Sequence, residues 1–418
     1  MTRSINIDGY DPDKESWFNI KKFKIGNITF DKPEKSLDTN HISKNDTREI
    51  TSSYKFKFCE TRKVLTDFSS ISKIDEETDD VKINSFFGKY FNSSNLPQAV
   101  NFTFNFLPPS DSKSLDALAG FYDHYYSRSN FILTVPNLRV FKHTQATLLA
   151  KPERIREVNN QQYKTFVDKS VEILDTKNNR PIFVPVSLRI SINDIREIIP
   201  HYLKKQYYNF WFDFEGIALN ENTLPKLRAF FRILLNKGIL DKTIIYFTNI
   251  RREIMFNFKD VESPGSDILC AIAGANLIGI DRGNPRFDPK LVAAAKVSKI
   301  ASKSSESGKN DSNEIKKTPS TEQAEPIDPR ARLLEASSYF YIKAKEKKYH
   351  DKSKYTAYNS LILAREFTNQ ADYFATQGKG SLTKFLNQKR MLTSFHDGTL
   401  LKKLASKPVS SEDTSVFD

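Results

Sequence analysis

The chain has 418 residues, 64 Lys and Arg against 51 Asp and Glu, a formal charge of +13 and 39% hydrophobic residues. This length allows two or three domains, or one large barrel with an added segment. No apolar run is long enough to span a membrane. Two cysteines, Cys59 and Cys270, exclude a disulfide framework and a four-cysteine zinc site. We therefore expect a soluble protein in a reducing, cytoplasmic setting, and the positive charge is a weak indication of a polyanionic partner.

Composition divides the chain into four parts. Residues 1–297 form the expected barrel domain, polar and irregular at first and rich in aromatic and β-branched runs later. Residues 298–329 are mainly Ser, Lys, Glu, Asn and Pro, and they predict a disordered linker because so polar a segment cannot offset the entropy of ordering it. Residues 330–405 predict a helical segment, and residues 406–418 a loose tail.

Strand-like runs alternate with helical segments in the middle of the chain. The runs are 99–107, 130–136, 182–190, 208–215, 243–249 and 276–281. Such alternation predicts a parallel sheet with helices outside. Two further strands at 23–30 and 54–59 bring the count to eight. We therefore predict an α/β fold, a (β/α)₈ TIM-like barrel with a C-terminal helical appendage, and keep an open doubly wound parallel sheet as the alternative.

Within these strands, one set of alternate residues is apolar and the other becomes polar toward the C-terminal end. Phe210, Phe212 and Phe214, for example, oppose Trp211, Asp213 and Glu215. In a barrel the apolar set meets the helices and the other set fills the lumen. The polar residues would then gather at the C-terminal mouth, where barrel enzymes keep their chemistry. They are Asn105, Thr134, Ser187, Arg189, Asp213, Glu215, Thr248 and Asp281.

Asp213 and Glu215 are the best local candidates for chemistry. Two carboxylates two apart on a strand share a face, so one can act as an acid while the other stays ionised. The same residues could instead form an internal ion-pair network with Arg189. They could also ligate a divalent metal. The six histidines fit surface positions better than a metal site. No other cofactor is predicted.

Two basic features lie further along the chain. Arg282 and Gly283 follow the last predicted strand, where backbone N–H groups and a guanidinium would favour an anion, or where the segment is an ordinary turn. Aromatic and basic residues are mixed in segments 339–343 and 345–349. That pattern suits RNA, and it also fits a helix with an aromatic core stripe and a solvated Lys face.

The stretch from Pro181 to Arg282 resembles the last four strands of a tRNA-guanine transglycosylase barrel. The resemblance rests on the strand spacing and on the passage 274–281, which leads into a strand with an acidic residue at its end. It implies that Asp281 is the nucleophile that attacks a ribose anomeric carbon during base exchange, and that tRNA is the partner. The sequence departs from the family at Phe214-Glu215-Gly216, where the family has paired glycines, and it lacks the cysteines of the family's zinc site.

Three functional hypotheses follow. The first is a transglycosylase-like transferase that acts on or binds a nucleobase in RNA. The second is a barrel enzyme that uses Asp213 and Glu215 on a small anionic substrate, with Arg189 and Arg282 as anion clamps. The third is a non-catalytic scaffold or interaction protein in which the polar lumen serves structure. The sequence leaves the substrate and the oligomeric state open.

Overall fold

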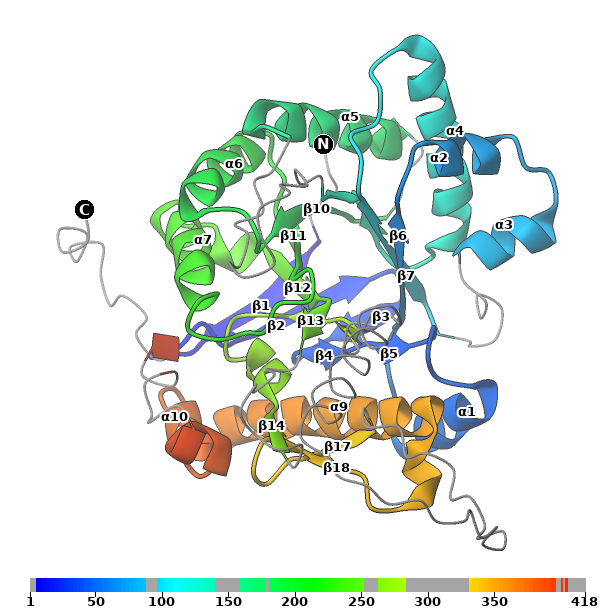
Figure 1. Ribbon diagram of the computed structural model, residues 1–418. Coiled ribbons are helices and arrows are strands. Elements are labelled where there is room, and N and C mark those ends of the chain that lie inside the picture. Colours follow the sequence, from blue (N-terminus) through cyan, green and yellow to red (C-terminus); the bar gives the residue numbers. More distant parts are fainter. Residues whose placement is uncertain are drawn as a thin grey trace, which may run out of the picture.

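Parallel strands form a closed barrel at the centre of the computed structural model, and helices surround it (Figure 1). The structure describes residues 5–87, 96–139, 158–176, 180–251, 262–282 and 331–395, with residues 400, 403 and 404. The strands that form the wall, in order around it, are β4 and β5 (Glu34–Lys35 and Leu37–Asp38), β6 (Cys59–Leu65), β7 (Gln98–Phe104), β8 and β9 (Leu133–Thr134 and Asn137–Leu138), β10 (Ile182–Ser187), β11 (Asn209–Asp213), β12 (Ile244–Thr248) and β15 (Leu277–Ile278).

Two segments close this wall because each pairs with a neighbour on either side. Segment 34–38 pairs with β15 through β4 and with β6 through β5, and segment 133–138 pairs with β10 through β8 and with β7 through β9. All of these pairings are parallel. The barrel therefore closes with eight strand segments, as the sequence predicts. Beyond β12 and β15, β13 (Ile250–Arg251) and β16 (Asp281–Arg282) extend the wall and pair with each other.

Helices follow the strands in the order that the alternation predicts. They are α1 (Lys44–Ser53), α2 (Ser69–Asp75), α3 (Asp80–Phe87), α4 (Ser112–Arg128), α5 (Asn160–Thr176), α6 (Ile192–Lys204), α7 (Leu224–Asn236) and, after the last strand, α9 (Lys352–Gln377). The apolar parity of the strands packs against these helices. Phe212, for example, lies edge-on to Phe230 of α7 at 4.7 Å between ring centroids.

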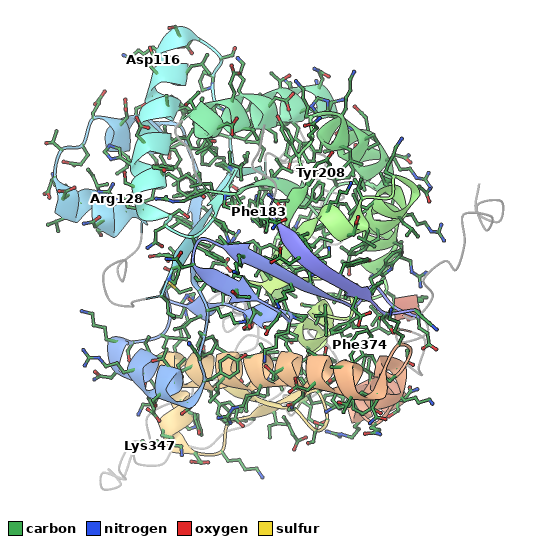
Figure 2. The ribbon with its side chains drawn as sticks, turned by 180° about the vertical axis from the view of Figure 1, so that it is seen from behind. Asp116, Arg128, Phe183, Tyr208, Lys347 and Phe374 are labelled. Carbon is green, nitrogen blue, oxygen red and sulfur yellow. The ribbon has the colours of Figure 1, made fainter. Side chains whose placement is uncertain are left out.

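An antiparallel sheet covers the N-terminal end of the barrel. It consists of β1 (Ile7–Pro12), β2 (Asn19–Ile25) and β3 (Ile28–Phe30), and it crosses in front of the barrel when the molecule is seen from behind (Figure 2). Phe23 and Phe30 stack at 4.9 Å and pack in one cluster with Phe183 and Trp211, which point into the lumen. A cluster of aromatic side chains therefore closes the lower lumen.

The C-terminal segment lies directly on the barrel. It begins with two strands, β17 (Arg332–Glu335) and β18 (Phe340–Lys343), which form an antiparallel sheet with β14 (Glu262–Pro264). Then α9 packs against β4, β5 and α1, and α10 (Leu382–Asn387) follows it. The sequence-based expectation of helices alone over 330–405 was thus incomplete. None of the described helices is both long and apolar enough to cross a membrane.

Two strand assignments from the sequence were wrong. Segment 23–30 forms part of the antiparallel sheet at the N-terminal end, and the first barrel strand is the shorter segment 34–38. The second barrel strand begins at Cys59, where the predicted strand 54–59 ends. The predicted linker, residues 298–329, and the tail, residues 406–418, lie outside the described residues.

Candidate functional site

Asp213, at the end of β11, is the centre of a polar cluster at the C-terminal mouth of the lumen. Its carboxylate is fully buried. Oδ1 accepts hydrogen bonds from the Glu215 backbone N–H at 2.8 Å and from Asn249 Nδ2 at 2.5 Å. Oδ2 accepts from Thr103 Oγ1 at 3.0 Å and Asn137 Nδ2 at 3.1 Å. Four donors from four different parts of the wall therefore hold one carboxylate in a fixed position.

Glu215 lies beside Asp213 and is also fully buried. Its Oε1 accepts from Ser187 Oγ at 2.5 Å and from Asn137 Nδ2 at 3.1 Å. Oε2 lies 3.3 Å from Arg139 Nε and 3.4 Å from Arg189 Nε. The single Asn137 amide nitrogen thus donates to both carboxyl groups, which makes the two acids one unit.

The environment drives the pKa values of these two acids in opposite directions. Burial raises the pKa of Glu215, and the Asp213 carboxylate raises it further, against the opposing effects of Ser187, Arg139 and Arg189. Burial acts on Asp213 in the same sense, but the Arg62 charge and several hydrogen bonds outweigh it and lower the pKa of Asp213 overall. Asp213 therefore stays ionised, and Glu215 is the acid that holds its proton more tightly.

The backbone at this mouth adopts an unusual conformation. Glu215 has a φ of 48° and Asn249, across the neighbouring strand end, has a φ of 60°. Asn tolerates the left-handed region, whereas a Glu there is uncommon and costs free energy. The conformation turns the Glu215 N–H onto Asp213 and lets the Gly216 N–H donate to the Asn249 carbonyl at 2.9 Å. Backbone strain is thus located at the carboxyl pair.

Three arginines surround the carboxyl pair. Arg62 reaches from β6, Arg139 follows β9, and Arg189 follows β10. Arg62 lies 4.0 Å from Asp213 Oδ2, and its side chain is 13% exposed; those of Arg139 and Arg189 are 16% and 26% exposed. Among the described residues, three guanidinium groups thus face the two carboxyl groups, an arrangement suited to an anion.

A third buried acid, Glu60 of β6, lies deeper against the other side of the lumen. Thr248 Oγ1 donates to it at 2.5 Å, Asn101 Nδ2 at 2.8 Å and the Ile280 backbone N–H at 2.8 Å. Of the predicted site residues, Thr248 belongs to this Glu60 cluster. Thr134 is linked to it, because its hydroxyl donates to Asn101 Oδ1 at 2.9 Å.

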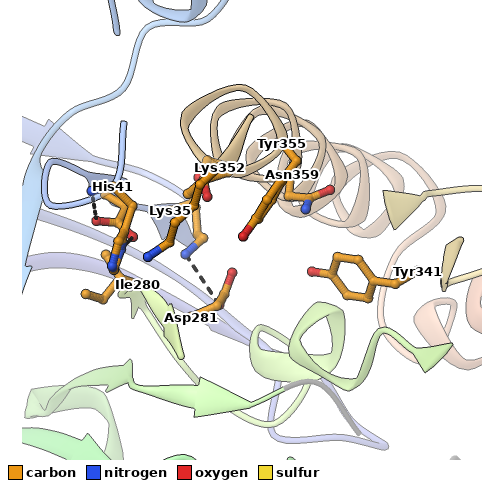
Figure 3. Close-up of a pocket in the computed structure, with 11 residues that line it drawn as sticks. Lys35, His41, Ile280, Asp281, Tyr341, Lys352, Tyr355 and Asn359 are labelled. Atoms are coloured by element: carbon orange, nitrogen blue, oxygen red, sulfur yellow. Dashed lines mark hydrogen bonds and ion pairs between the residues drawn. The ribbon is translucent and has the colours of Figure 1, made fainter. Parts of the chain in front are cut away.

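Asp281 is not brought together with Asp213 and Glu215. It lies 3.6 Å from Lys35 Nζ, on the side of the wall that α9 covers, and lines a pocket of about 50 Å³ (Figure 3). The other side chains lining this pocket are Lys35, Asp38, His41, Ile280, Tyr341, Lys352, Tyr355, Thr356, Asn359 and Ser360. The prediction that Asp281 faces the lumen fails because the strand is interrupted after Ile278. Gly279 is the lumen position, where an added Cβ would meet Glu60 Oε2 at 2.1 Å.

The remaining predicted site residues divide clearly. Ser187 and Arg189 lie in the carboxyl cluster, as predicted. Asn105 is exposed beyond the end of β7 and does not join it, and the side chain of Arg282 lies outside the described part. Within the described ranges, no three or more His, Cys, Asp and Glu side chains group so as to hold a metal ion.

Sequence reasoning missed Glu60, Arg62, Asn137, Arg139 and Asn249. The alternation in Cys59–Leu65, with Glu60 and Arg62 on one parity, is the signal that could have identified the first two. Asn137 and Arg139 lie just beyond the predicted strand 130–136, and Asn249 breaks the alternation through its positive φ.

Comparison of the sequence with protein-family models and with curated proteins finds no match in either case. The resemblance of residues 181–282 to transglycosylase barrels therefore stays a prediction, and the position of Asp281 gives it no support as a nucleophile that shares the lumen site.

Proposed function

We propose that the chain is a barrel enzyme that acts on a small anionic substrate by proton transfer between the substrate and the Asp213–Glu215 pair. The observation that carries this proposal is the coupling of two buried carboxyl groups whose pKa values are shifted in opposite directions. Such a pair supplies a general base and a general acid at the same pH. Asp213 is the base in this scheme and Glu215 the acid.

The substrate class follows from the charge around the pair. Arg62, Arg139 and Arg189 converge on the mouth from three parts of the wall, and planar guanidinium groups favour carboxylates and phosphates. A bound anion would replace part of the interaction that Arg139 and Arg189 now make with Glu215. The substrate thereby raises the pKa of Glu215 further and prepares it to donate a proton.

The test begins with small phosphorylated and carboxylated metabolites, screened for binding by thermal shift and for turnover by NMR. Glu215→Gln keeps the size of the side chain and removes the proton donor, so turnover should fall by about 100-fold or more while anion binding persists. Asp213→Asn should lower turnover similarly. Asp372→Asn, at an exposed position on α9, is the charge-matched control.

The scaffold hypothesis makes a different prediction for the same variants. If Asp213→Asn and Glu215→Gln lower only the free energy of unfolding, and wild type binds none of the anions, the cluster is an internal ion-pair network and the enzymatic proposal is wrong.

A further inference from the structure

Asn137 connects the two acids and is itself held from outside the lumen. Its Nδ2 group carries two hydrogens, and the two carboxyl acceptors, Asp213 Oδ2 and Glu215 Oε1, each lie 3.1 Å from this nitrogen. The amide oxygen points the other way and accepts from the hydroxyl of Tyr163 at 3.2 Å. Every polar atom of the Asn137 side chain therefore has a partner, and the amide has one favourable orientation.

Tyr163 reaches this position from α5 and is buried, 1% exposed. Its hydroxyl also lies 3.1 Å from the carbonyl of Pro185, which accepts from Tyr202 as well at 3.1 Å. Because Tyr202 already supplies a donor to that carbonyl, the Tyr163 hydrogen is needed at the Asn137 oxygen. If the amide turned over, its oxygen would face two carboxyl groups and repel whichever is ionised.

We infer that Asn137 is a positioning residue that couples the two acids, and that Tyr163 orients its amide for this task. The inference rests on the proposed function for its role in a reaction, but the coupling itself is a property of the folded protein. Each N–H bond favours the ionised form of its acceptor, so Asn137 limits how far burial can raise the pKa of Glu215 and helps to keep Asp213 charged.

Other groups also face the pair, and they stay in place in the variants below. Arg62, Arg139 and Arg189 supply positive charge from the wall, and Lys226 of α7 adds a further charge that interacts with Glu215. Thr103, Ser187 and Asn249 are neutral donors. Replacing Asn137 therefore removes only its two hydrogen bonds from the groups that set the pKa values of Asp213 and Glu215. A change in these pKa values can then be assigned to Asn137.

The experiment is a ¹³C NMR titration of the Asp and Glu carboxyl carbons, with the two resonances assigned through Asp213→Asn and Glu215→Gln. In Asn137→Ala the pKa of both acids should rise by about one pH unit, because each loses a charge-assisted hydrogen bond. In Tyr163→Phe, which removes only the hydroxyl, a smaller rise of about half a unit is expected.

Tyr122→Phe is the matched control. Tyr122 lies on α4, and its buried hydroxyl donates to Ser170 of α5, the helix that carries Tyr163, at 2.9 Å. The substitution removes this hydroxyl away from the carboxyl pair and should leave both titrations unchanged. Unshifted titrations in Tyr163→Phe, or equal shifts in the control, would overturn the role of Tyr163. Unshifted titrations in a folded Asn137→Ala would overturn the coupling, and if that variant does not fold, Tyr163→Phe decides alone. Since the titration needs no substrate, shifted pKa values without any turnover would reject the proposed function and keep this inference.

Discussion

Glu60 is a buried acid, and the groups described as donating hydrogen bonds to it are all uncharged. Its replacement should therefore lower the stability of the barrel. The donors Asn101, Thr248 and the Ile280 N–H come from three parts of the wall, on both sides of the point where the last strand meets the first. Glu60→Ala leaves them without their acceptor, and a buried unpaired group is expensive, so we expect a loss of ~3 kcal/mol. Urea unfolding followed by circular dichroism measures this. A loss below ~1 kcal/mol would mean that water or rearranged side chains satisfy the donors.

Glu60 should also make the stability of the protein depend on pH. Burial raises the pKa of Glu60 above its ordinary value of 4.5. The folded state therefore holds this proton more tightly than the unfolded chain, and stability falls as the pH rises from 4.5 toward the folded pKa. Glu60→Gln stays neutral and lacks this dependence. The unfolding free energy of wild type, measured relative to that of Glu60→Gln, should consequently fall as the pH rises from 4.5 to 7. A constant difference would contradict the raised pKa.

Residue positions in the site were predictable where a strand had a regular alternation. Ser187 and Asp213 follow from parity because they end the uninterrupted strands β10 and β11. Glu215 and Arg189 lie two residues beyond those ends, and they join the same cluster although Glu215 has left the extended conformation. The alternation fails at Asp281, because Gly279 makes room for the Glu60 carboxylate and the strand resumes only at β16. A side chain from a distant strand decides this, and no local pattern records it.

At the scale of elements, the antiparallel sheet at the N-terminal end depends on one buried lysine. Lys21 of β2 is 1% exposed, and its ammonium group donates to the carbonyls of Leu240, at 2.7 Å, and Thr243. These carbonyls precede β12, so Lys21 joins the covering sheet to the barrel. Burial lowers its pKa to about 7 from 10.5, against the attraction of Asp241.

This shift predicts a pH-dependent contribution from Lys21. Between the two pKa values the unfolded chain binds a proton that the folded protein does not, so stability rises with pH. From pH 7 to 9 the stability of wild type relative to Lys21→Met should increase by about 2 kcal/mol. Chemical denaturation at several pH values measures it. Lys24→Met, an exposed position of the same strand, should show no such trend, and an equal trend there would remove the assignment to Lys21.

The first barrel strand shows why some elements could not be predicted. Segment 34–38 reads Glu-Lys-Ser-Leu-Asp, which has no apolar run and follows a proline. It is a strand because β15 and β6 offer it hydrogen bonds, as from the Ser36 N–H to Ile278 at 2.8 Å, and because α9 covers it. Segment 19–25, which carries Ile20, Phe23 and Ile25, is the stronger local signal, yet it belongs to the covering sheet.

For the whole molecule, the C-terminal segment should be inseparable from the barrel. Helix α9 lies on two short wall strands, β4 and β5, and its apolar side chains close the core there. Polar contacts add to this. Tyr341 donates to Asp267 at 2.5 Å, Arg390 pairs with Glu262 at 2.8 Å, and the Gly380 N–H donates to Asp13 at 2.6 Å.

These contacts predict the behaviour of a cut chain. With a specific protease site introduced between residues 298 and 329, the cleaved protein should elute as one species at the size of the intact chain and unfold in a single transition. Burial of apolar surface between α9 and the wall holds the two pieces together, and the connection between them contributes mainly effective concentration. If the C-terminal piece instead elutes separately while the barrel keeps its circular dichroism, α9 is an independent appendage. In that case the wall at segment 34–38 must be stable without a helix over it.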